Sequence, residues 1–414
     1  MDQETPRARL GLARHLALSV YWFSLNFHWG SLLTVVISTQ MLRFVAEAEK
    51  GRALGLTLAM GALVAMLVQP LMGAISDRST FRWGRRRPYL LTGTLLNAAG
   101  LLALAYATGL WWLFGAYLFV QFANNMAGSP YQGLIPDLVP PEQRGTASGF
   151  MGLMSMLGSI GGVLLAGLFL GQGWLVHFYW LVMAVIMVGM ALTCIGVKEE
   201  RLAQAPPFDW RSFLAGFWVS PRRHPDFAWL WATRFLVMLG FYSLLPLINY
   251  YLKDVLQMAN FAQATSTVSA VVMVGATLSS LASGWASDRL GRRALVCAAG
   301  LLMGSTCLAL LFAPPFWVIL AFGVVFGLGY GSFISVDWAL AVDVLPSLGS
   351  AARDLGIWSI AVTMPQVVGP LISGPLIDTF NRLQPLMGYR VVFALAFLYL
   401  LLGSVGVWRI RGAR

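Results

Sequence analysis

Long apolar segments separated by short polar turns follow one another along the whole chain. Each apolar segment is long enough for a helix that crosses the hydrocarbon core of a bilayer, which takes about 20 residues. The pattern therefore predicts twelve membrane-spanning helices. We expect them at residues 15–41, 52–76, 88–108, 110–136, 145–171, 174–197, 227–252, 262–287, 293–313, 315–344, 352–379 and 388–409.

Composition supports a lipid environment, because 58% of the residues are hydrophobic and 11% are charged, against about 25% charged in soluble domains. The formal net charge of +11 could suggest a nucleic-acid partner. However, most Lys and Arg residues fall in the turns on one side of the predicted membrane, which is the positive-inside pattern. We therefore expect no nucleic-acid partner and a multi-pass protein of the inner (cytoplasmic) membrane with both termini in the cytoplasm.

One polar connection is much longer than the others, and it contains four prolines and several basic residues. It lies between the sixth and seventh predicted spans, so it divides the chain into two halves. We expect a first six-helix half at residues 1–197, a cytoplasmic linker at 198–225 and a second six-helix half at 226–414.

The two halves share motifs. The pattern Gly-x-x-Ser-Asp-Arg…Gly-Arg-Arg occurs at Gly73–Arg86 and again at Gly284–Arg293, with four extra residues in the first copy. A second pair of turns carries Pro136-Asp137 in the first half and Val342-Asp343 in the second. Motifs that recur half a chain apart indicate two copies of one structural unit in parallel orientation.

These motifs resemble the signature loops of the major facilitator superfamily. The longer form at Ser76–Pro88 is similar to sucrose:proton symporters and to the glycoside-pentoside-hexuronide-like group. The resemblance implies an all-α membrane protein of twelve transmembrane helices in two parallel six-helix halves, with a central site between the halves. One departure is Gln132-Gly133-Leu134-Ile135-Pro136-Asp137, where the sucrose group commonly has Arg-Ala-Leu-Leu-Ala-Asp.

The resemblance also implies a gating role for the charged turns. Asp77 would face the eleventh helix near Arg353, and Asp288 would face the fifth helix near Arg144, where a carboxylate can interact with a helix N-terminus. The alternative is that these turns only fix orientation through their positive charge. The predicted gating residues are Asp77, Arg78, Arg85, Arg86, Asp137, Arg144, Asp288, Arg289, Arg292, Asp343 and Arg353.

Polar side chains at helical spacing mark four spans, the first, fourth, seventh and tenth. In the first span these are Tyr21, Ser24, His28 and Ser31. A single stripe could be ordinary hydrogen bonding between helices, whereas stripes on all four spans favour a hydrated central cavity. The predicted substrate-binding residues are His28, Asn124, Asn125, Tyr131, Gln132, Tyr242, Asn249, Trp338 and Trp358.

Asp337 is an isolated carboxylate well inside a predicted span. An acid in such a place can take up a proton near neutral pH and so couple transport to a proton gradient. The alternative is a permanent ion pair with Arg234, the cation inside a span of the same half. His28 is the second candidate proton carrier, because histidine titrates near neutral pH.

The sequence thus favours a secondary transporter, and not an enzyme, that works by alternating access and carries a sugar or glycoside with protons. An exporter of lipophilic compounds by proton antiport is the second hypothesis, because the same aromatic side chains suit either cargo. A non-transporting assembly factor on the same fold is the third. We expect no cofactor and no metal site, and a monomer whose partners are the small solute, protons and the lipid bilayer.

Overall fold

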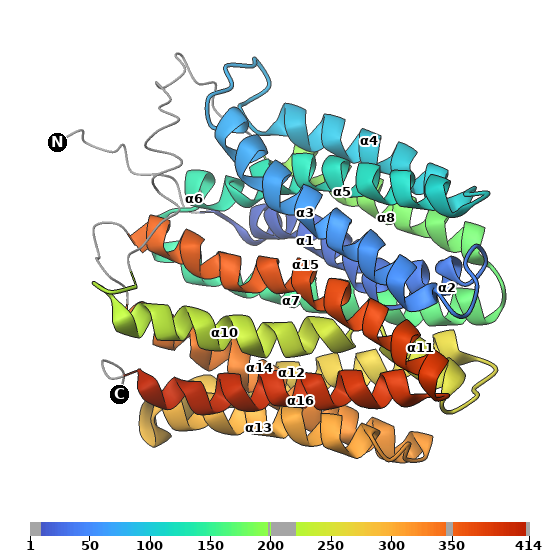
Figure 1. The fold of residues 1–414 in the computed structure, drawn as a ribbon. Helices are drawn as coiled ribbons and strands as arrows, with labels where there is room; N and C mark the ends of the chain where they lie inside the picture. Colours follow the sequence, from blue (N-terminus) through green and yellow to red (C-terminus); the bar gives the residue numbers. More distant parts are fainter. Residues whose placement is uncertain (1–9, 198, 200–220, 345–350, 411–414) are drawn as a thin grey trace. The chain divides into compact units, whose positions relative to one another are not determined.

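The computed structural model of the protein describes residues 10–197, 199, 221–344 and 351–410. Within these ranges every regular element is a helix (Figure 1). Eleven helical segments are long and apolar enough to cross a membrane. The prediction of an all-α protein with many membrane-spanning helices is confirmed for the described residues. The fourth predicted span is a helix of 23 residues, α5 (Leu110–Gln132), which carries several polar side chains and is not among those eleven.

Contacts between the helices divide the chain into two compact units. The first unit comprises residues 1–32 and 63–207, and the second comprises 33–62 and 208–414. The segment 33–62 therefore packs with the second unit, although the sequence alone assigns it to the first half. The predicted division at residues 198–225 remains a prediction.

The first unit contains the helices of the first half. They are α1 (Leu12–Ser31), the C-terminal part of α3 (Lys50–Ser76), α4 (Arg87–Ala105), α5, α6 (Leu134–Leu138), η2 (Pro141–Gln143), α7 (Arg144–Gly171) and α8 (Leu175–Gly196). The helix α1 packs on α7 and α8, while α4 packs on α5 and α8.

The second unit repeats this arrangement. It contains most of η1 (Leu32–Val36), α2 (Ile37–Met41), the start of α3, α10 (Pro225–Leu244), α11 (Ile248–Asp254), α12 (Phe261–Leu290), α13 (Arg292–Leu310), α14 (Phe316–Asp343), α15 (Ala351–Leu383), α16 (Met387–Gly406) and η4 (Val407–Arg409). Here α10 packs on α15 and α16, and α13 packs on α14 and α16. Equivalent helices of the two halves therefore pack in the same pairs, as expected for two copies of one unit.

Glycines allow α7 to approach α1 closely. A Cβ atom added at Gly158 or Gly162 would lie 2.2 Å from the carbonyl oxygen of Phe23 or Phe27, respectively. No side chain fits at such distances, so these glycines permit the backbones of the two helices to touch.

Two predicted spans are interrupted helices. The first span contains the π-helical turn η1 between α1 and α2. The seventh span is divided into α10 and α11 around Pro246, which has no amide hydrogen to donate to the helix. Such interruptions move the following side chains to a different face, and an amphipathic pattern does not reveal them.

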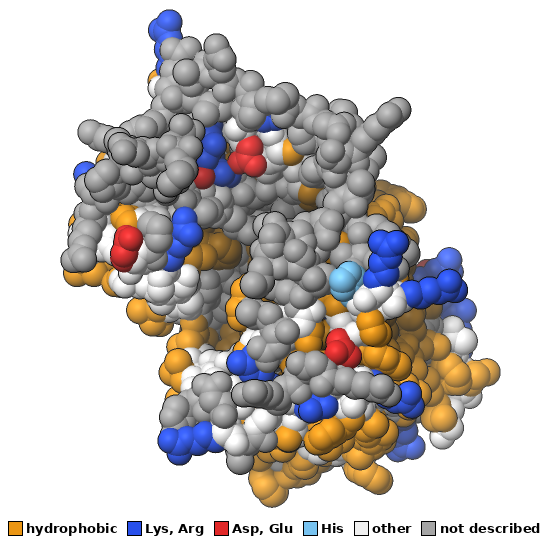
Figure 2. Space-filling view, turned by 90° about the vertical axis from the view of Figure 1, so that its left-hand side faces the viewer, with side chains coloured by type: hydrophobic (Ala, Val, Ile, Leu, Met, Phe, Trp, Pro, Cys, Tyr) orange, Lys and Arg blue, Asp and Glu red, His pale blue; other side chains and the backbone are white. Residues whose placement is uncertain are grey.

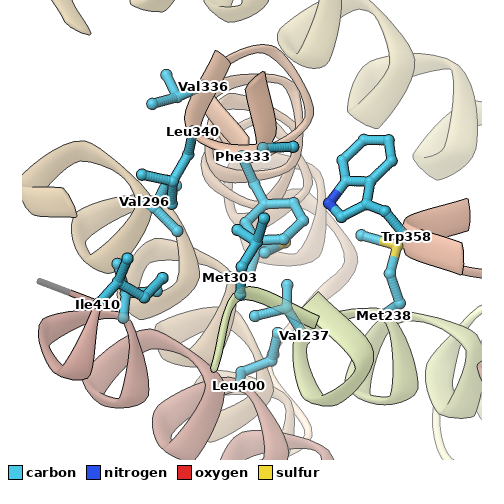
Figure 3. Packing of buried hydrophobic residues seen from close by; sticks show 14 of the residues in the cluster. Val237, Met238, Val296, Met303, Phe333, Val336, Leu340, Trp358, Leu400 and Ile410 are labelled. Atoms are coloured by element: carbon cyan, nitrogen blue, oxygen red, sulfur yellow. The ribbon is translucent and has the colours of Figure 1, made fainter. Parts of the chain in front are cut away.

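The core of the second unit is a cluster of apolar side chains from α10, α13, α14, α15 and α16. Val237, Met303, Phe333 and Leu400 are fully buried at its centre (Figure 3). Met238 and Trp358 lie at one side of the cluster (Figure 3). This packing fixes the helices that carry the charged residues described below.

Candidate functional sites

The predicted polar face of α1 is buried between helices. The Tyr21 hydroxyl and the Thr94 hydroxyl of α4 form a hydrogen bond of 2.7 Å. The Ser24 hydroxyl donates to the Val185 carbonyl of α8 at 2.9 Å. Tyr21, Ser24 and Ser31 are at most 1% exposed, so their hydrogen bonds hold α1 to its neighbours or to its own backbone. The polar stripe of α1 therefore fits the alternative interpretation, in which the side chains form ordinary hydrogen bonds between helices and do not line a hydrated cavity.

The buried side chains of His28 and Asn124 form a hydrogen-bonded group with the partly exposed Trp29. The Trp29 indole donates to Asn124 Oδ1 at 2.8 Å, and this bond fixes the orientation of the amide. Asn124 Nδ2 then donates to His28 Nδ1 at 3.3 Å. Because Nδ1 accepts a hydrogen bond, the neutral imidazole carries its proton on Nε2. That nitrogen is buried and has no hydrogen-bond partner in the described part of the chain.

The partly exposed face of α1 was missed by the sequence analysis. Trp22, Asn26 and Trp29 are partly exposed at the spacing i, i+4 and i+7, which places them on one side of the helix. The Asn26 amide donates to the Trp22 carbonyl at 2.9 Å. The same spacing is visible in the sequence, but the neighbouring stripe that runs from Tyr21 to Ser31 contains more polar residues.

Predicted residues on α5 differ in their environment. Asn125 is partly buried and donates to the Gln121 carbonyl at 2.8 Å, while Gln132 is exposed. Tyr131 is buried, and its hydroxyl donates to the Leu18 carbonyl at 2.5 Å and accepts from the Trp22 amide at 3.2 Å. Tyr131 therefore inserts into the backbone hydrogen bonds of α1, which is a recognised cause of local bending.

A buried ion pair lies in the second unit. Arg234 of α10 donates through Nη1 to Asp337 of α14. The Asp337 side chain is 1% exposed and the Arg234 side chain 8% exposed. The Arg234 guanidinium also covers the Trp358 ring, 3.4 Å from the ring centroid. The structure therefore brings these predicted residues together, and it adds Trp358 of α15 to the pair.

Trp338 lies next to this pair. Its ring packs edge-on against Trp358, with 5.2 Å between ring centroids. Trp338 is 50% exposed, whereas Trp358 is 4% exposed. The Arg234 Nε and Trp358 Nε1 atoms are buried and have no partner among the described residues. The group thus has one accessible aromatic side chain beside a largely sealed charge pair.

The two remaining predicted substrate residues have protein partners. The Tyr242 hydroxyl accepts from the Gln366 amide at 3.1 Å. The Asn249 amide donates to the Ser38 and Thr39 hydroxyls and accepts from the Thr265 hydroxyl. Asn249 is fully buried, so in this structure it holds α2, α11 and α12 together.

The charged turn between α3 and α4 forms a network within the first unit. Arg86 pairs with Asp77 at 2.8 Å and with Asp137 at 2.5 Å, and Arg85 also pairs with Asp137. Within the first unit Asp77 pairs with Arg86, and the predicted approach of Asp77 to the helix near Arg353 remains a prediction. Arg144 is exposed at the start of α7. The side chains of Asp288, Asp343 and Arg353 lie outside the described residues.

Glu199 completes this network and was not predicted, because the sequence assigns it to the linker. Its carboxylate accepts hydrogen bonds from the backbone amides of Arg86 and Arg87, each at 3.0 Å, where α4 begins. Burial raises the pKa of Glu199 above its ordinary value, although these hydrogen bonds and the Arg86 charge oppose the shift.

In the second copy of the motif, Arg292 donates to the Ala339 carbonyl at 2.6 Å.

A second ionic cluster lies in the second unit, at the start of α3, and it was also missed. Lys50 pairs with Glu47 and Asp254, and Lys253 pairs with the same two carboxylates. The Tyr389 hydroxyl donates to Asp254. Burial alone would raise the pKa of Glu47, but its bonds to the two lysines lower it below the ordinary value. We call these five residues the lysine cluster.

Asp378 of α15 caps α3 beside the lysine cluster. Its carboxylate accepts from the backbone amides of Gly51 at 3.0 Å and Arg52 at 2.6 Å. A carboxylate at a helix N-terminus is favourable because the amides there have no partner in the helix. Added Cβ atoms at Gly51 and Gly55 would lie 2.5 Å from the Gly374 carbonyl oxygen and 2.2 Å from that of Pro370, so the two helices touch along their backbones.

No group of three or more His, Cys, Asp and Glu side chains in the described part of the chain is arranged to hold a metal ion. The charged groups described above instead pair with one another or accept hydrogen bonds from backbone amides. The chemistry that they offer is reversible ion pairing and proton transfer.

Comparison with known proteins places these features in context. Residues 33–407 match the family described as MFS/sugar transport protein. The sucrose transport protein SUC4 of Arabidopsis thaliana is 30% identical over 118 residues, which cover 24% of this chain and 23% of the plant protein. The multi-drug resistance efflux pump PmrA of Streptococcus pneumoniae is 22% identical over 391 residues, which cover 91% of each chain. The crystal structure of a bacterial homolog of the human lysosomal transporter Spinster has a TM-score of 0.76 at 17% identity, covering 97% of this chain and 99% of that one.

Proposed function

The chain belongs to the MFS/sugar transport protein family, and from this premise we propose that it carries a sugar or glycoside together with protons by alternating access. The Arg234–Asp337 pair is the observation that supports proton coupling most directly. The ionised pair has no net charge, and a proton on Asp337 leaves one positive charge in a buried place. Such a change costs free energy unless the surroundings rearrange, so protonation and conformation are linked.

The substrate contacts the partly exposed polar residues of α1 and α5 in the first unit. Asn26, Asn125 and Gln132 offer amide donors and acceptors, and Trp22 and Trp29 offer apolar ring surfaces. His28 and Asn124 are buried, so they act by holding Trp29 in place. In the second unit the half-exposed Trp338 is the accessible aromatic residue beside the charge pair.

Two networks act as gates in this proposal. The Arg85–Arg86–Asp77–Asp137 network, with Glu199, stabilises one end of the first unit. The lysine cluster and Asp378 hold the start of α3 against α11 and α15 in the second unit. Alternating access requires contacts that form in one state and break in the other, and exposed or partly buried ion pairs are weak enough to do so.

Transport by the purified full-length chain in proteoliposomes tests this function. We expect an inward proton gradient to drive accumulation of a sugar such as sucrose or an α-glucoside. Gln132→Ala should weaken sugar binding about 2–13-fold, because Gln132 is exposed in this structure and one hydrogen bond contributes about 0.5–1.5 kcal/mol net. Glu142→Gln, at an exposed position of η2, is the control.

Export of lipophilic compounds is the second candidate, supported by the similarity to PmrA over 91% of both chains. It replaces the sugar hypothesis if lipophilic cations, and no sugars, stabilise the purified protein against thermal unfolding. If neither class binds or is transported under any gradient, both transport hypotheses are wrong and a non-transporting role remains.

A further inference from the structure

The turn between α3 and α4 contains a feature that the transport proposal leaves unexplained. Its motif has four more residues between Arg78 and Gly84 than the second copy has between Arg289 and Gly291. In the second copy the chain turns directly at Gly291, which has a φ of +87°. In the first copy Gly84 makes the equivalent turn with a φ of +104°. The additional residues are therefore not needed to reverse the chain.

These residues place large side chains at the surface. Phe81 is 54% exposed and Trp83 is 69% exposed, and Arg82 between them is also exposed. The base of the turn is held in place, because the hydroxyls of Ser79 and Tyr89 form a hydrogen bond of 2.6 Å. A fixed base thus presents Phe81, Arg82 and Trp83, which we call the turn tip.

Water is an unfavourable environment for the turn tip. Exposed apolar surface costs about 25 cal/mol for each Å² that could be buried. The tip follows α3, on which Leu67, Leu71 and Ile75 are exposed at the helical spacing i, i+4 and i+8. A stripe of large apolar side chains along a membrane-spanning helix contacts lipid, so the tip continues a lipid-facing surface beyond the end of the helix.

The charge of the turn indicates which lipid it meets. Residues 77–87 contain five arginines and one aspartate. Arg85 and Arg86 pair with Asp77 and Asp137, whereas Arg82 is exposed at the tip. Among the described residues, several Lys and Arg side chains are visible on the face shown in Figure 2. Indole rings favour the headgroup region of a bilayer, where one side of the ring is apolar and the other is wet. Arginine binds phosphate groups through paired hydrogen bonds.

We propose that the turn tip is a membrane anchor that binds anionic phospholipid. Phe81 and Trp83 insert between the headgroups, and Arg82 binds a lipid phosphate. A soluble protein partner for the same surface is the competing possibility. The inference does not depend on the transported solute, so it can succeed or fail separately from the proposed function.

Fluorescence in nanodiscs tests the anchor with the full-length chain. Cys194, Cys297 and Cys307 are replaced by serine, and Trp83→Cys is labelled with an environment-sensitive fluorophore. In discs that contain phosphatidylglycerol we expect blue-shifted emission that is protected from iodide and quenched by brominated lipid. A label at Trp111→Cys, an exposed position at the start of α5, reports whether any exposed position gives the same result.

The charge requirement is tested in the labelled chain by Arg82→Gln. We expect about fivefold more phosphatidylglycerol to be needed for half of the spectral shift, since one basic residue near an anionic surface contributes about 1 kcal/mol. The matched control is Arg43→Gln, an exposed arginine in the turn between α2 and α3, which should leave the titration unchanged. The proposal is wrong if iodide quenches the Trp83→Cys label freely in all discs, and that result would favour a soluble partner. It is also wrong if the two arginine variants have equal effects.

Discussion

The Arg234 guanidinium lies against the face of the Trp358 ring, with 3.4 Å between the guanidinium carbon and the ring centroid. The same guanidinium donates to Asp337. One face of the Trp358 ring is therefore occupied by a cation and is not open for stacking on a sugar. We expect Trp358 to hold Arg234 in position for Asp337, so that α10, α14 and α15 meet at one charge pair.

Trp358→Leu tests this positioning role. Without the ring, Arg234 is held less firmly and stabilises the ionised Asp337 less, so Asp337 should take up its proton more readily. We expect the midpoint of the pH profile of transport to move up by about 0.4 to 1.5 units, because a cation–π contact contributes about 0.5–2 kcal/mol. Trp358→Phe should restore most of the original midpoint.

The control for this variant is Trp317→Leu, at an exposed position near the start of α14. If Trp358→Leu lowers the transport rate equally at every pH, as a general loss of packing would, the positioning role is wrong.

Asp378 and the lysine cluster should keep the side chain at position 38 inaccessible to reagents in solution. Ser38 is fully buried and accepts a hydrogen bond from Asn249 at 2.8 Å. We expect Ser38→Cys, in a chain without its other cysteines, to react slowly with a maleimide. Adding Asp378→Ala removes the cap on the Gly51 and Arg52 amides. Such a cap contributes about 0.5–2 kcal/mol to stability, so labelling at position 38 should become about 2–30-fold faster. Adding Glu142→Gln instead should have no effect, and equal rates in all three chains would contradict the gate.

The lysine cluster should also give stability a dependence on pH. The pKa of Glu47 is lower in the folded protein than its ordinary value of 4.5. As pH falls, the unfolded chain therefore binds this proton first. The contribution of Glu47 to stability is present above the ordinary pKa and is lost as pH falls through the folded pKa.

Thermal unfolding of the wild type and Glu47→Gln from pH 8 downward measures this contribution. We expect the wild type to melt at the higher temperature at neutral pH, and the difference to shrink below about pH 4.5. A difference that grows in acid would show that the charge of Glu47 destabilises the fold.

The sequence predicted the helices better than the positions of their side chains. Twelve spans and two repeats follow from apolar length and repeated motifs. The ion pair of Asp337 with Arg234, which the structure shows, was only the alternative prediction, based on the cost of unpaired charge in lipid. The face of α1 was harder to predict. The same polar stripe is expected for a contact between helices, such as that of Tyr21 with Thr94, and for a surface open to solvent, such as that around Asn26.

The ionic clusters were missed for a different reason. Glu47, Asp254 and Asp378 lie at or near helix ends, where isolated charges are common and carry no pattern. Their contacts join residues more than 200 positions apart in the chain, and a single sequence contains no signal for such pairs. Glu199 likewise became recognisable only when its carboxylate was seen to accept from the first amides of α4.

Asp337→Asn is the most direct test of proton coupling. The side chain is 1% exposed and pairs with Arg234 inside a membrane-spanning helix. The amide keeps the shape and can still accept a hydrogen bond from Arg234, but it cannot exchange a proton. We therefore expect the variant to lose accumulation of solute driven by a pH gradient and to retain exchange of labelled for unlabelled solute, which needs no net proton movement. Uptake by proteoliposomes with and without an imposed gradient measures both activities.

The positive charge of Arg234 is unpaired in this variant, so thermal unfolding must first show that the variant is folded. A folded variant that still concentrates its solute would exclude Asp337 as the proton carrier, and His28 would then be the next residue to replace.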